Sequence, residues 1–386
     1  MERRPVILIL TSSGEYGNVS SVVAEAVRGE GSHNVVVLDE SKYDSRTGIS
    51  ALDRLMQVND EYKLVADKRM TAGEAFRYDR ASSGGGHKKL SRRNRRIANA
   101  VKRYRPEFIL ALTPYACAVA AEARRKTGFF TDIVYVMNGF VVHGEGAVHD
   151  ADCYIVENSE MKETLTQRGV PSRKVMVMGL PFDAVELTPI EREARKQELG
   201  LPKTPTVFLN ARKRDDSEEL LGLLTDQGSI LNTVCYTRDV RDVASLRAVA
   251  DADGGCGGVI VLTKEDLFEE YLSVSDIVVT SYDPSVLYKC FKTGKSVIVA
   301  ERTGSKHDAD LDYLTAQGLI LRASHNIDTV ALIYKLMQTD TAAQFAEKGE
   351  QRTEMFSLSN LAGYLTGYIS TRSENVPSLT NRQNEG

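Results

Sequence analysis

Short apolar runs alternate with amphipathic segments along the first half of the chain. The runs lie at residues 6–10, 35–38, 108–112, 133–137, 153–156 and 175–178. Runs of this length, apolar throughout, are typical of parallel strands buried on both faces of a sheet. The segments between them, including 19–28, 115–127 and 159–169, carry apolar residues at helical spacing. The pattern predicts an open, doubly wound α/β domain.

The same alternation repeats in the second half. Its apolar runs lie at residues 206–210, 234–237, 259–262, 277–280, 296–300 and 319–322, and further helical segments follow at 329–337 and 342–356. The polar end of the chain lacks apolar periodicity, as disordered tails do. We predict an N-terminal domain over residues 1–183, a linker over 184–203, a C-terminal domain over 204–365 and a disordered tail over 366–386.

Composition narrows the class of protein. A chain of 386 residues exceeds what one hydrophobic core usually organises, and 42% hydrophobic with 26% charged residues is ordinary for soluble proteins. The net charge of -4 gives no overall attraction to nucleic acid. The five cysteines lie far apart without C-x-x-C spacing, and no apolar stretch is long enough to span a bilayer. We expect a cytoplasmic protein with reduced thiols, no bound metal and at most peripheral membrane contact.

Candidate chemistry in the first domain lies in loops that follow apolar runs. Ligands of open α/β sheets bind beyond the carboxyl ends of the strands, where helix N-termini favour anions. The loop over residues 11–18 contains Gly14 and Gly17, which allow a ligand to approach the backbone closely, although a plain turn and helix cap would use the same residues. His143 follows the run at 133–137 and can accept a proton near neutral pH. A loop histidine bonded to local backbone is the alternative.

Three loops in the second domain combine cations, hydroxyls and a helix start. Each follows an apolar run, so each lies where a nucleotide diphosphate, a ribose or a sugar would bind. The candidate nucleotide-binding residues in these loops are Arg212, Lys213, Asp283, Pro284, Ser285, Gly304, Ser305 and Lys306. A solvated charge cluster or an ordinary surface loop would have a similar composition.

A basic run precedes the third apolar run. Its cations include Lys88, Lys89, Arg92, Arg93, Arg95 and Arg96, and it continues through a predicted helix to Arg105. Such a run attracts anionic surfaces, and membrane headgroups are a better candidate partner than nucleic acid. Few large apolar side chains accompany it, so insertion into lipid would be shallow. A solvated helix face is the alternative interpretation.

Two stretches resemble a known family. Residues 151–159 (ADCYIVENS) and 168–182 (RGVPSRKVMVMGLPF) are similar to the strand, helix and "G-x-P" exit that end the first domain of monogalactosyldiacylglycerol synthases and processive diacylglycerol glucosyltransferases. The peptidoglycan GlcNAc transferase is a more distant member of this group. The resemblance implies a GT-B fold, in which two Rossmann-like domains face a cleft and the C-terminal one holds a sugar nucleotide.

The resemblance also assigns roles to individual positions. His143 stands where the family has a histidine after its acceptor-side strand. The family's first loop ends in Gly-His, whereas here Gly17 is followed by Asn18, and Thr113 stands where many members have His-Pro. Lys289 aligns with an acidic ribose contact. The acceptor-side candidates are then Gly14, Gly17, Thr113 and Asn138.

Two functions of different classes follow. The first is a metal-independent glycosyltransferase that moves a sugar from a UDP-type donor to a lipid or other hydroxyl acceptor, with His143 as base and Asn18 orienting the substrate. It needs no cofactor besides the nucleotide sugar. The second is an inactive relative that keeps the fold and acts by binding or regulation, which the departures at Asn18, Asp283 and Lys289 favour. A nucleotide-sugar epimerase on the same architecture is a third, more remote possibility.

Overall fold

The computed structural model describes most of the chain between residues 95 and 353 and parts of the chain on either side. The described residues are 6–11, 20, 23–25, 28, 34–39, 95–143, 151–182, 184–211, 214–225, 230–252, 258–263, 265–301, 304–305, 307–338, 341–353, 361, 363–365 and 367. The chain divides into unit 1, formed by Met1–Pro181 with Phe356–Gly386, and unit 2, formed by Phe182–Met355. Each unit contains a six-stranded sheet with helices, which confirms the predicted α/β fold class.

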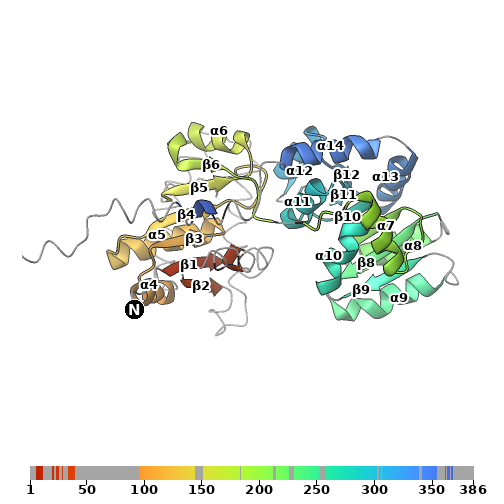
Figure 1. The fold of residues 1–386 in the computed structure, drawn as a ribbon, viewed down its shortest axis with the longest axis horizontal. Helices are drawn as coiled ribbons and strands as arrows, with labels where there is room; N and C mark the ends of the chain where they lie inside the picture. The colour runs from red at the N-terminus through yellow and green to blue at the C-terminus, as the bar shows by residue number, and fades with distance from the viewer. Residues whose placement is uncertain are drawn as a thin grey trace, which may run out of the picture. The chain divides into compact units, whose positions relative to one another are not determined.

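Unit 1 is built on a sheet in which all neighbouring strands are parallel (Figure 1). Its strands are β1 (Val6–Thr11), β2 (Asn34–Asp39), β3 (Phe108–Ala111), β4 (Asp132–Val136), β5 (Cys153–Val156) and β6 (Val175–Val177). The helices described in unit 1 are α4 (Arg95–Tyr104), α5 (Pro114–Thr127) and α6 (Ser159–Gln167), and a 3₁₀ turn, η3 (Ser172–Lys174), precedes β6. The strand order is β2-β1-β3-β4-β5-β6, so the direction of winding changes between β1 and β3.

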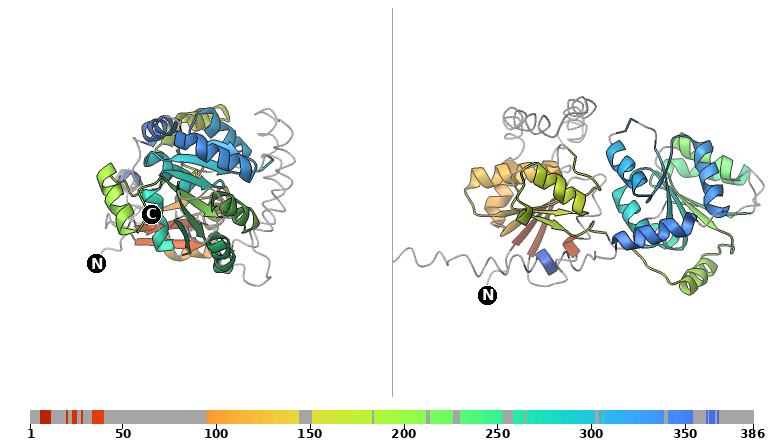
Figure 2. Two further views of the ribbon diagram at one scale, coloured as in Figure 1. Left: turned by 90° about the vertical axis from the view of Figure 1, so that its right-hand side faces the viewer. Right: turned by 90° about the horizontal axis from the view of Figure 1, so that it is seen from above.

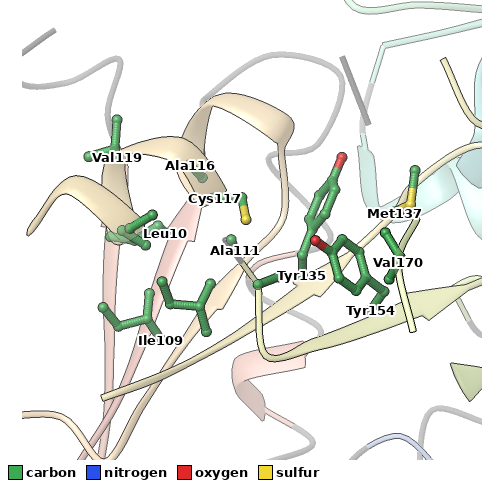
Figure 3. Packing of buried hydrophobic residues seen from close by; sticks show 14 of the residues in the cluster. Leu10, Ile109, Ala111, Ala116, Cys117, Val119, Tyr135, Met137, Tyr154 and Val170 are labelled. Atoms are coloured by element: carbon green, nitrogen blue, oxygen red, sulfur yellow. The ribbon is translucent and has the colours of Figure 1, made fainter. Parts of the chain in front are cut away.

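One face of this sheet is covered by α4, α5 and α6. Side chains alternate along a strand, and those of Leu10, Tyr135 and Tyr154 point to this face. The two tyrosines pack edge to face with ring centroids 6.2 Å apart (Figure 3). Helix α5 contributes small residues such as Ala116 and Cys117, which let its backbone lie close to the strands. The face is therefore a dry core without room for a ligand.

The end of the chain returns to unit 1. The Cys153 Sγ of β5 lies 3.5 Å from the Tyr364 hydroxyl, and Leu361 and Leu365 are fully buried in the same segment. Residues from Phe356 onward therefore belong to unit 1. The predicted C-terminal domain, which runs to residue 365, differs from this division because the last apolar side chains are buried on the first sheet. The predicted tail lies outside the described residues, except for residue 367.

Unit 2 contains a second parallel sheet with helices on both faces (Figure 2). Its strands are β7 (Thr206–Ala211), β8 (Asn232–Thr237), β9 (Val259–Leu262), β10 (Ile277–Thr280), β11 (Ser296–Ala300) and β12 (Leu321–Ala323). Its helices are α7 (Pro189–Glu198), α8 (Arg214–Thr225), η4 (Val240–Asp242), α9 (Val243–Ala252), α10 (Glu265–Val274), α11 (Pro284–Lys292), α12 (Asp308–Ala316), α13 (Asn326–Gln338) and α14 (Thr341–Thr353).

The strand order of unit 2 is β12-β11-β10-β7-β8-β9. Read from the β9 end and numbered within the unit, this is 3-2-1-4-5-6, the order of the dinucleotide-binding Rossmann fold. Helices α8, α9 and α13 pack on one face through residues such as Leu220 and Ile333. On the other face Phe268 of α10 packs edge to face on Phe208, with ring centroids 5.2 Å apart. The order reverses between β7 and β10, which is where such sheets bind their ligands.

Charged side chains fix α7 to the amino end of β10. The Asp276 carboxylate accepts hydrogen bonds from Lys196 Nζ (2.8 Å), Arg192 Nη1 (3.2 Å) and the backbone N–H of Thr206 (2.8 Å). Lys196 is only 4% exposed, so its buried charge would destabilise the folded state without this partner. Although α7 lies inside the predicted linker over residues 184–203, it is part of unit 2 and packs against α10.

This arrangement yields a stability prediction. Asp276→Asn removes the countercharge of the buried Lys196 ammonium, so we expect the free energy of unfolding to fall by about 1–3 kcal/mol. The control is Glu198→Gln, because Glu198 is 61% exposed in its ion pair with Arg195 and should contribute less than about 0.5 kcal/mol. Urea denaturation measures both variants, and equal midpoints would contradict the role given to Asp276.

Candidate functional site

Polar side chains follow β3 and β4 at the carboxyl edge of the first sheet. The Thr113 hydroxyl caps α5 by accepting a hydrogen bond from the N–H of Ala116 (3.0 Å). The Asn138 Nδ2 atom donates to the carbonyl of Leu112 (2.8 Å), the residue before Thr113. Two predicted acceptor-side residues, Thr113 and Asn138, are thereby brought together at one edge.

Two buried polar atoms at this edge have no hydrogen-bond partner in the described part of the chain. They are Thr11 Oγ1, at the end of β1, and Asn138 Oδ1. Buried polar atoms are nearly always paired, so a bound molecule or water is the expected partner for such atoms. The predicted site residues Gly14, Gly17 and Asn18 belong to the loop after β1, which lies outside the described residues.

The segment that carries His143 is held by side chains of α6 and its flanks. Asn158, which caps α6, donates through Nδ2 to the carbonyl of Phe140 (2.9 Å). Arg168, at the other end of α6, donates to the carbonyls of Val142 (3.2 Å) and His143 (3.0 Å). The His143 side chain is exposed at the carboxyl edge of the sheet. Sequence analysis missed Asn158 and Arg168, since nothing in their spacing shows which carbonyls they reach.

The switch point of unit 2 carries a chain of hydrogen bonds. Asn210, near the end of β7, donates through Nδ2 to Thr280 Oγ1 of β10 (3.1 Å), and Thr280 Oγ1 donates to the carbonyl of Ser281 (2.9 Å). The Ser281 Oγ atom is buried and has no partner among the residues the structure describes. The predicted cations Arg212 and Lys213 follow β7 but lie outside the described residues.

The N-terminus of α11 is occupied by its own cap. The Asp283 carboxylate accepts hydrogen bonds from the N–H groups of Ser285 and of the next residue (3.1 and 3.4 Å), and Pro284 has no N–H to offer. A phosphate would have to displace a like charge to reach these amides. Lys289, further along α11, forms an ion pair with Glu269 of α10. These predicted nucleotide-binding residues therefore have partners within unit 2.

The loop after β11 is closed by hydrogen bonds to the start of α12. Gly304, at φ 86°, adopts a conformation that favours glycine, and its N–H donates to Asp308 Oδ2 (2.7 Å). The Ser305 hydroxyl accepts the N–H of His307 (3.1 Å). Lys306 lies outside the described residues. The structure brings Gly304 and Ser305 together with His307.

A partly buried carboxylate joins this loop to the one after β10. Glu301 accepts the Tyr282 N–H (3.0 Å), and its Oε1 lies 3.0 Å from His307 Nδ1. Burial by itself would raise the pKa of Glu301, but hydrogen bonds from His307, Tyr282 and Ser305 outweigh it and lower the pKa to about 2. The rings of Tyr282 and His307 are stacked, with centroids 4.3 Å apart. Sequence analysis missed Glu301 and Tyr282, although Glu301 directly follows a predicted strand and Tyr282 is the second residue after another.

Other kinds of site find no support in the described residues. No cluster of three or more His, Cys, Asp or Glu side chains among them is arranged to hold a metal ion. None of the four described cysteines forms a disulfide, and burial raises the pKa of the Cys235 and Cys290 thiols to about 12, which makes them poor nucleophiles. No helix in the described part of the chain is long and apolar enough to cross a membrane.

Comparison with known proteins agrees with this geometry. The family model described as monogalactosyldiacylglycerol (MGDG) synthase matches residues 75–182, less than a third of the chain. The two stretches on which the resemblance was based lie inside this segment, so the resemblance is confirmed there. A comparison with curated protein sequences gives no significant match.

Solved structures match nearly the whole chain. Anabaena Alr3699/HepE in complex with UDP is 15% identical with a TM-score of 0.55, covering 95% of this chain and 99% of that one. Acinetobacter baumannii MurG is 12% identical with a TM-score of 0.61, covering 94% and 100%. The UDP-GlcNAc 2-epimerase of Neisseria meningitidis bound to UDP-GlcNAc is 12% identical with a TM-score of 0.59, covering 95% and 100%. The chain has the two-domain, Rossmann-like fold of the GT-B glycosyltransferases.

The pKa of Glu301 gives a prediction with a definite pH window. Its folded-state pKa of about 2 lies below the usual 4.5, so the stabilisation by its carboxylate is fully present above pH 4.5 and is lost as the pH falls toward 2. The melting temperature of Glu301→Gln should lie below that of the wild type at pH 6, and the gap should close between pH 4.5 and 2. Glu163→Gln, on the exposed side of α6, should show no such gap. A constant gap for Glu301→Gln across this window would contradict the assignment.

Proposed function

We propose that unit 2 binds a UDP-type nucleotide sugar and that the protein transfers the sugar to a hydroxyl acceptor. The observation that carries this proposal is the reversal of strand order between β7 and β10, with the polar residues Asn210, Thr280 and Ser281 at the strand ends. The UDP complex of HepE and the UDP-GlcNAc complex of the epimerase support it, because both proteins share the fold.

We assign the donor contacts to three loops of unit 2. Arg212 and Lys213 after β7 and Lys306 after β11 supply positive charge for the diphosphate, and the Gly304 and Ser305 segment covers the ribose or the sugar. The cations and the helix dipoles stabilise the departing diphosphate without a metal ion. The nucleotide sugar is a co-substrate, and the proposed reaction needs no further cofactor.

On the acceptor side, His143 is the proposed base. It takes the proton of the attacking hydroxyl while that oxygen forms a bond to the sugar carbon and the diphosphate leaves with the bonding electron pair. Asn158 and Arg168 support this role, because they fix the backbone of the His143 segment through three carbonyl groups. Asn18, in the loop after β1, would orient the acceptor.

A second candidate is a protein that has kept the fold and lost catalysis. The position of Asp283 favours it, because a carboxylate takes the α11 amides that would otherwise face a phosphate. The ion pair of Lys289 with Glu269 favours it as well, since it directs this cation toward α10. The epimerase among the similar structures makes epimerisation of a nucleotide sugar the third candidate.

One variant, His143→Ala, distinguishes nucleotide binding from catalysis. Wild-type protein should bind UDP in calorimetry and show a raised melting temperature. His143→Ala should lower the rate of sugar transfer about 100-fold or more while the UDP affinity changes less than about twofold, because loss of a base acts on the barrier. His325→Ala, an exposed histidine of unit 2, serves as control. Transfer at the wild-type rate by His143→Ala would remove His143 from the mechanism.

We also propose that unit 1 contacts an anionic membrane surface at the cytoplasmic face. Arg95 and Arg96 begin α4, and Lys102 and Arg103 in its last turn are exposed. Lys88, Lys89, Arg92 and Arg93 precede α4 and lie outside the described residues. The side chain of Phe130 in the loop after α5 is fully exposed. This loop is bonded to the segment after α4 through Thr131 and the carbonyl of Pro106 (2.8 Å), which brings the Phe130 loop to the end of α4 that carries Lys102 and Arg103.

Vesicle binding tests this surface. Protein should bind vesicles that contain phosphatidylglycerol more tightly than phosphatidylcholine vesicles, and salt should weaken the binding because exposed charges act through a screened field. Lys102→Glu with Arg103→Glu should reduce binding about thirtyfold or more, at roughly 1 kcal/mol for each cation removed. The matched control is Arg173→Glu with Lys203→Glu, two exposed cations elsewhere. Equal binding to the two vesicle types would refute the proposal.

A further inference from the structure

The diphosphate of a bound nucleotide needs positive partners that α11 does not offer. Asp283 closes the N-terminus of this helix by accepting the N–H groups of Ser285 and Val286. In a Rossmann-type sheet, such amides at a strand end beside the switch point are the usual place for phosphate. The charge of the diphosphate must therefore be met by side chains near this position.

His307 is the described side chain best placed to meet it. Its ring stacks on Tyr282, the residue directly before Asp283, with centroids 4.3 Å apart and an interplanar angle of 23°. The stacking places the imidazole next to the strand end from which α11 starts. The His307 side chain is 13% exposed, whereas the other two described histidines, His143 and His325, are exposed. The ring is thus held by packing while part of the side chain stays exposed.

Glu301 determines which nitrogen of the His307 imidazole is left for a ligand. Its Oε1 lies 3.0 Å from His307 Nδ1, and its Oε2 accepts the Tyr282 N–H. The hydrogen bonds that Glu301 receives keep its carboxylate ionised at neutral pH, so it acts only as an acceptor and Nδ1 must carry a proton. The remaining nitrogen, Nε2, has no hydrogen-bond partner in the described part of the chain. With Nδ1 donating to Glu301, a hydrogen bond from Nε2 to a phosphate oxygen requires a proton on each ring nitrogen.

The neighbouring carboxylate, Asp308, has partners other than His307. Asp308 accepts the N–H of Gly304 and forms an ion pair with Arg322. Burial by itself would raise the pKa of Asp308, but these bonds outweigh it and lower the pKa. Arg322 also reaches Asp312 (3.1 Å). Asp308 therefore has its own partners in Gly304 and Arg322.

We infer that His307 binds the diphosphate of the nucleotide by donating a hydrogen bond from Nε2, and that Glu301 is the positioning residue that holds Nδ1 and orients the ring. The inference rests on the proposed binding of a nucleotide to unit 2 and adds a residue to that site. In this site the imidazole of His307, oriented by Glu301, takes the place of the helix amides that Asp283 occupies.

Calorimetry with UDP, uridine and inorganic pyrophosphate tests this contact. His307→Ala should weaken UDP and pyrophosphate binding about tenfold to a hundredfold and leave uridine affinity within twofold, because the lost contact is a charged hydrogen bond to phosphate. His307→Gln, which places an amide donor near the Nε2 position, should recover part of the loss. Glu301→Gln should weaken UDP binding while His325→Ala should not.

A measurement on the wild type makes the test independent of how the variants fold. The ¹⁵N resonance of His307 Nε2 should move on addition of UDP or pyrophosphate and stay in place with uridine. An unmoved resonance, or equal losses for UDP and uridine in His307→Ala, would overturn the role of His307 while nucleotide binding stands. Failure of the wild type to bind UDP at all would overturn the proposed function itself and this inference with it.

Discussion

Both sheets are parallel throughout, and this constraint governs where chemistry can be placed. A parallel strand must be reached through a crossover that covers a face of the sheet, so the strands are buried on both sides and leave no open face for a ligand. In the core of unit 1, Leu8, Leu10 and Ile109 are fully buried. Polar side chains therefore concentrate at the two edges where strands begin and end.

The two edges of unit 2 use their charges differently. At the amino edge, Asp276 binds Lys196 and a backbone N–H, which attaches α7 to the sheet. The Lys295 ammonium at the same edge donates to the carbonyls that end α10, and burial lowers the pKa of this lysine to about 8. At the carboxyl edge, Ser281 Oγ has no partner in the described part of the chain, and Glu301 orders an imidazole. The charges at the amino edge attach helices to the sheet, whereas the carboxyl edge keeps a buried hydroxyl without a partner among the described residues.

Both carboxyl edges rely on side chains that hold the backbone of a neighbouring loop. In unit 1, Asn138 and Asn158 bind carbonyls of the segments after β3 and β4. In unit 2, Glu301 receives an N–H from the segment after β10. Loops fixed in this way present their side chains in a set geometry before any ligand arrives, which lowers the cost of ordering them on binding. Asp283 is the exception, since its carboxylate fills a position that the fold leaves open to anions.

The sequence by itself determined the strands, the helices between them, the α/β class and the loops that carry His143 and Gly304, because these follow from short-range periodicity and from glycines. It did not determine the strand order, the return of the chain end to unit 1 or the pairing of Glu301 with His307, since these depend on contacts between distant segments. Leu319 shows the limit even locally. It belongs to an apolar run read as a strand, yet its N–H bonds to the carbonyl of Leu314 and ends α12, because burial alone does not distinguish a helix cap from a strand.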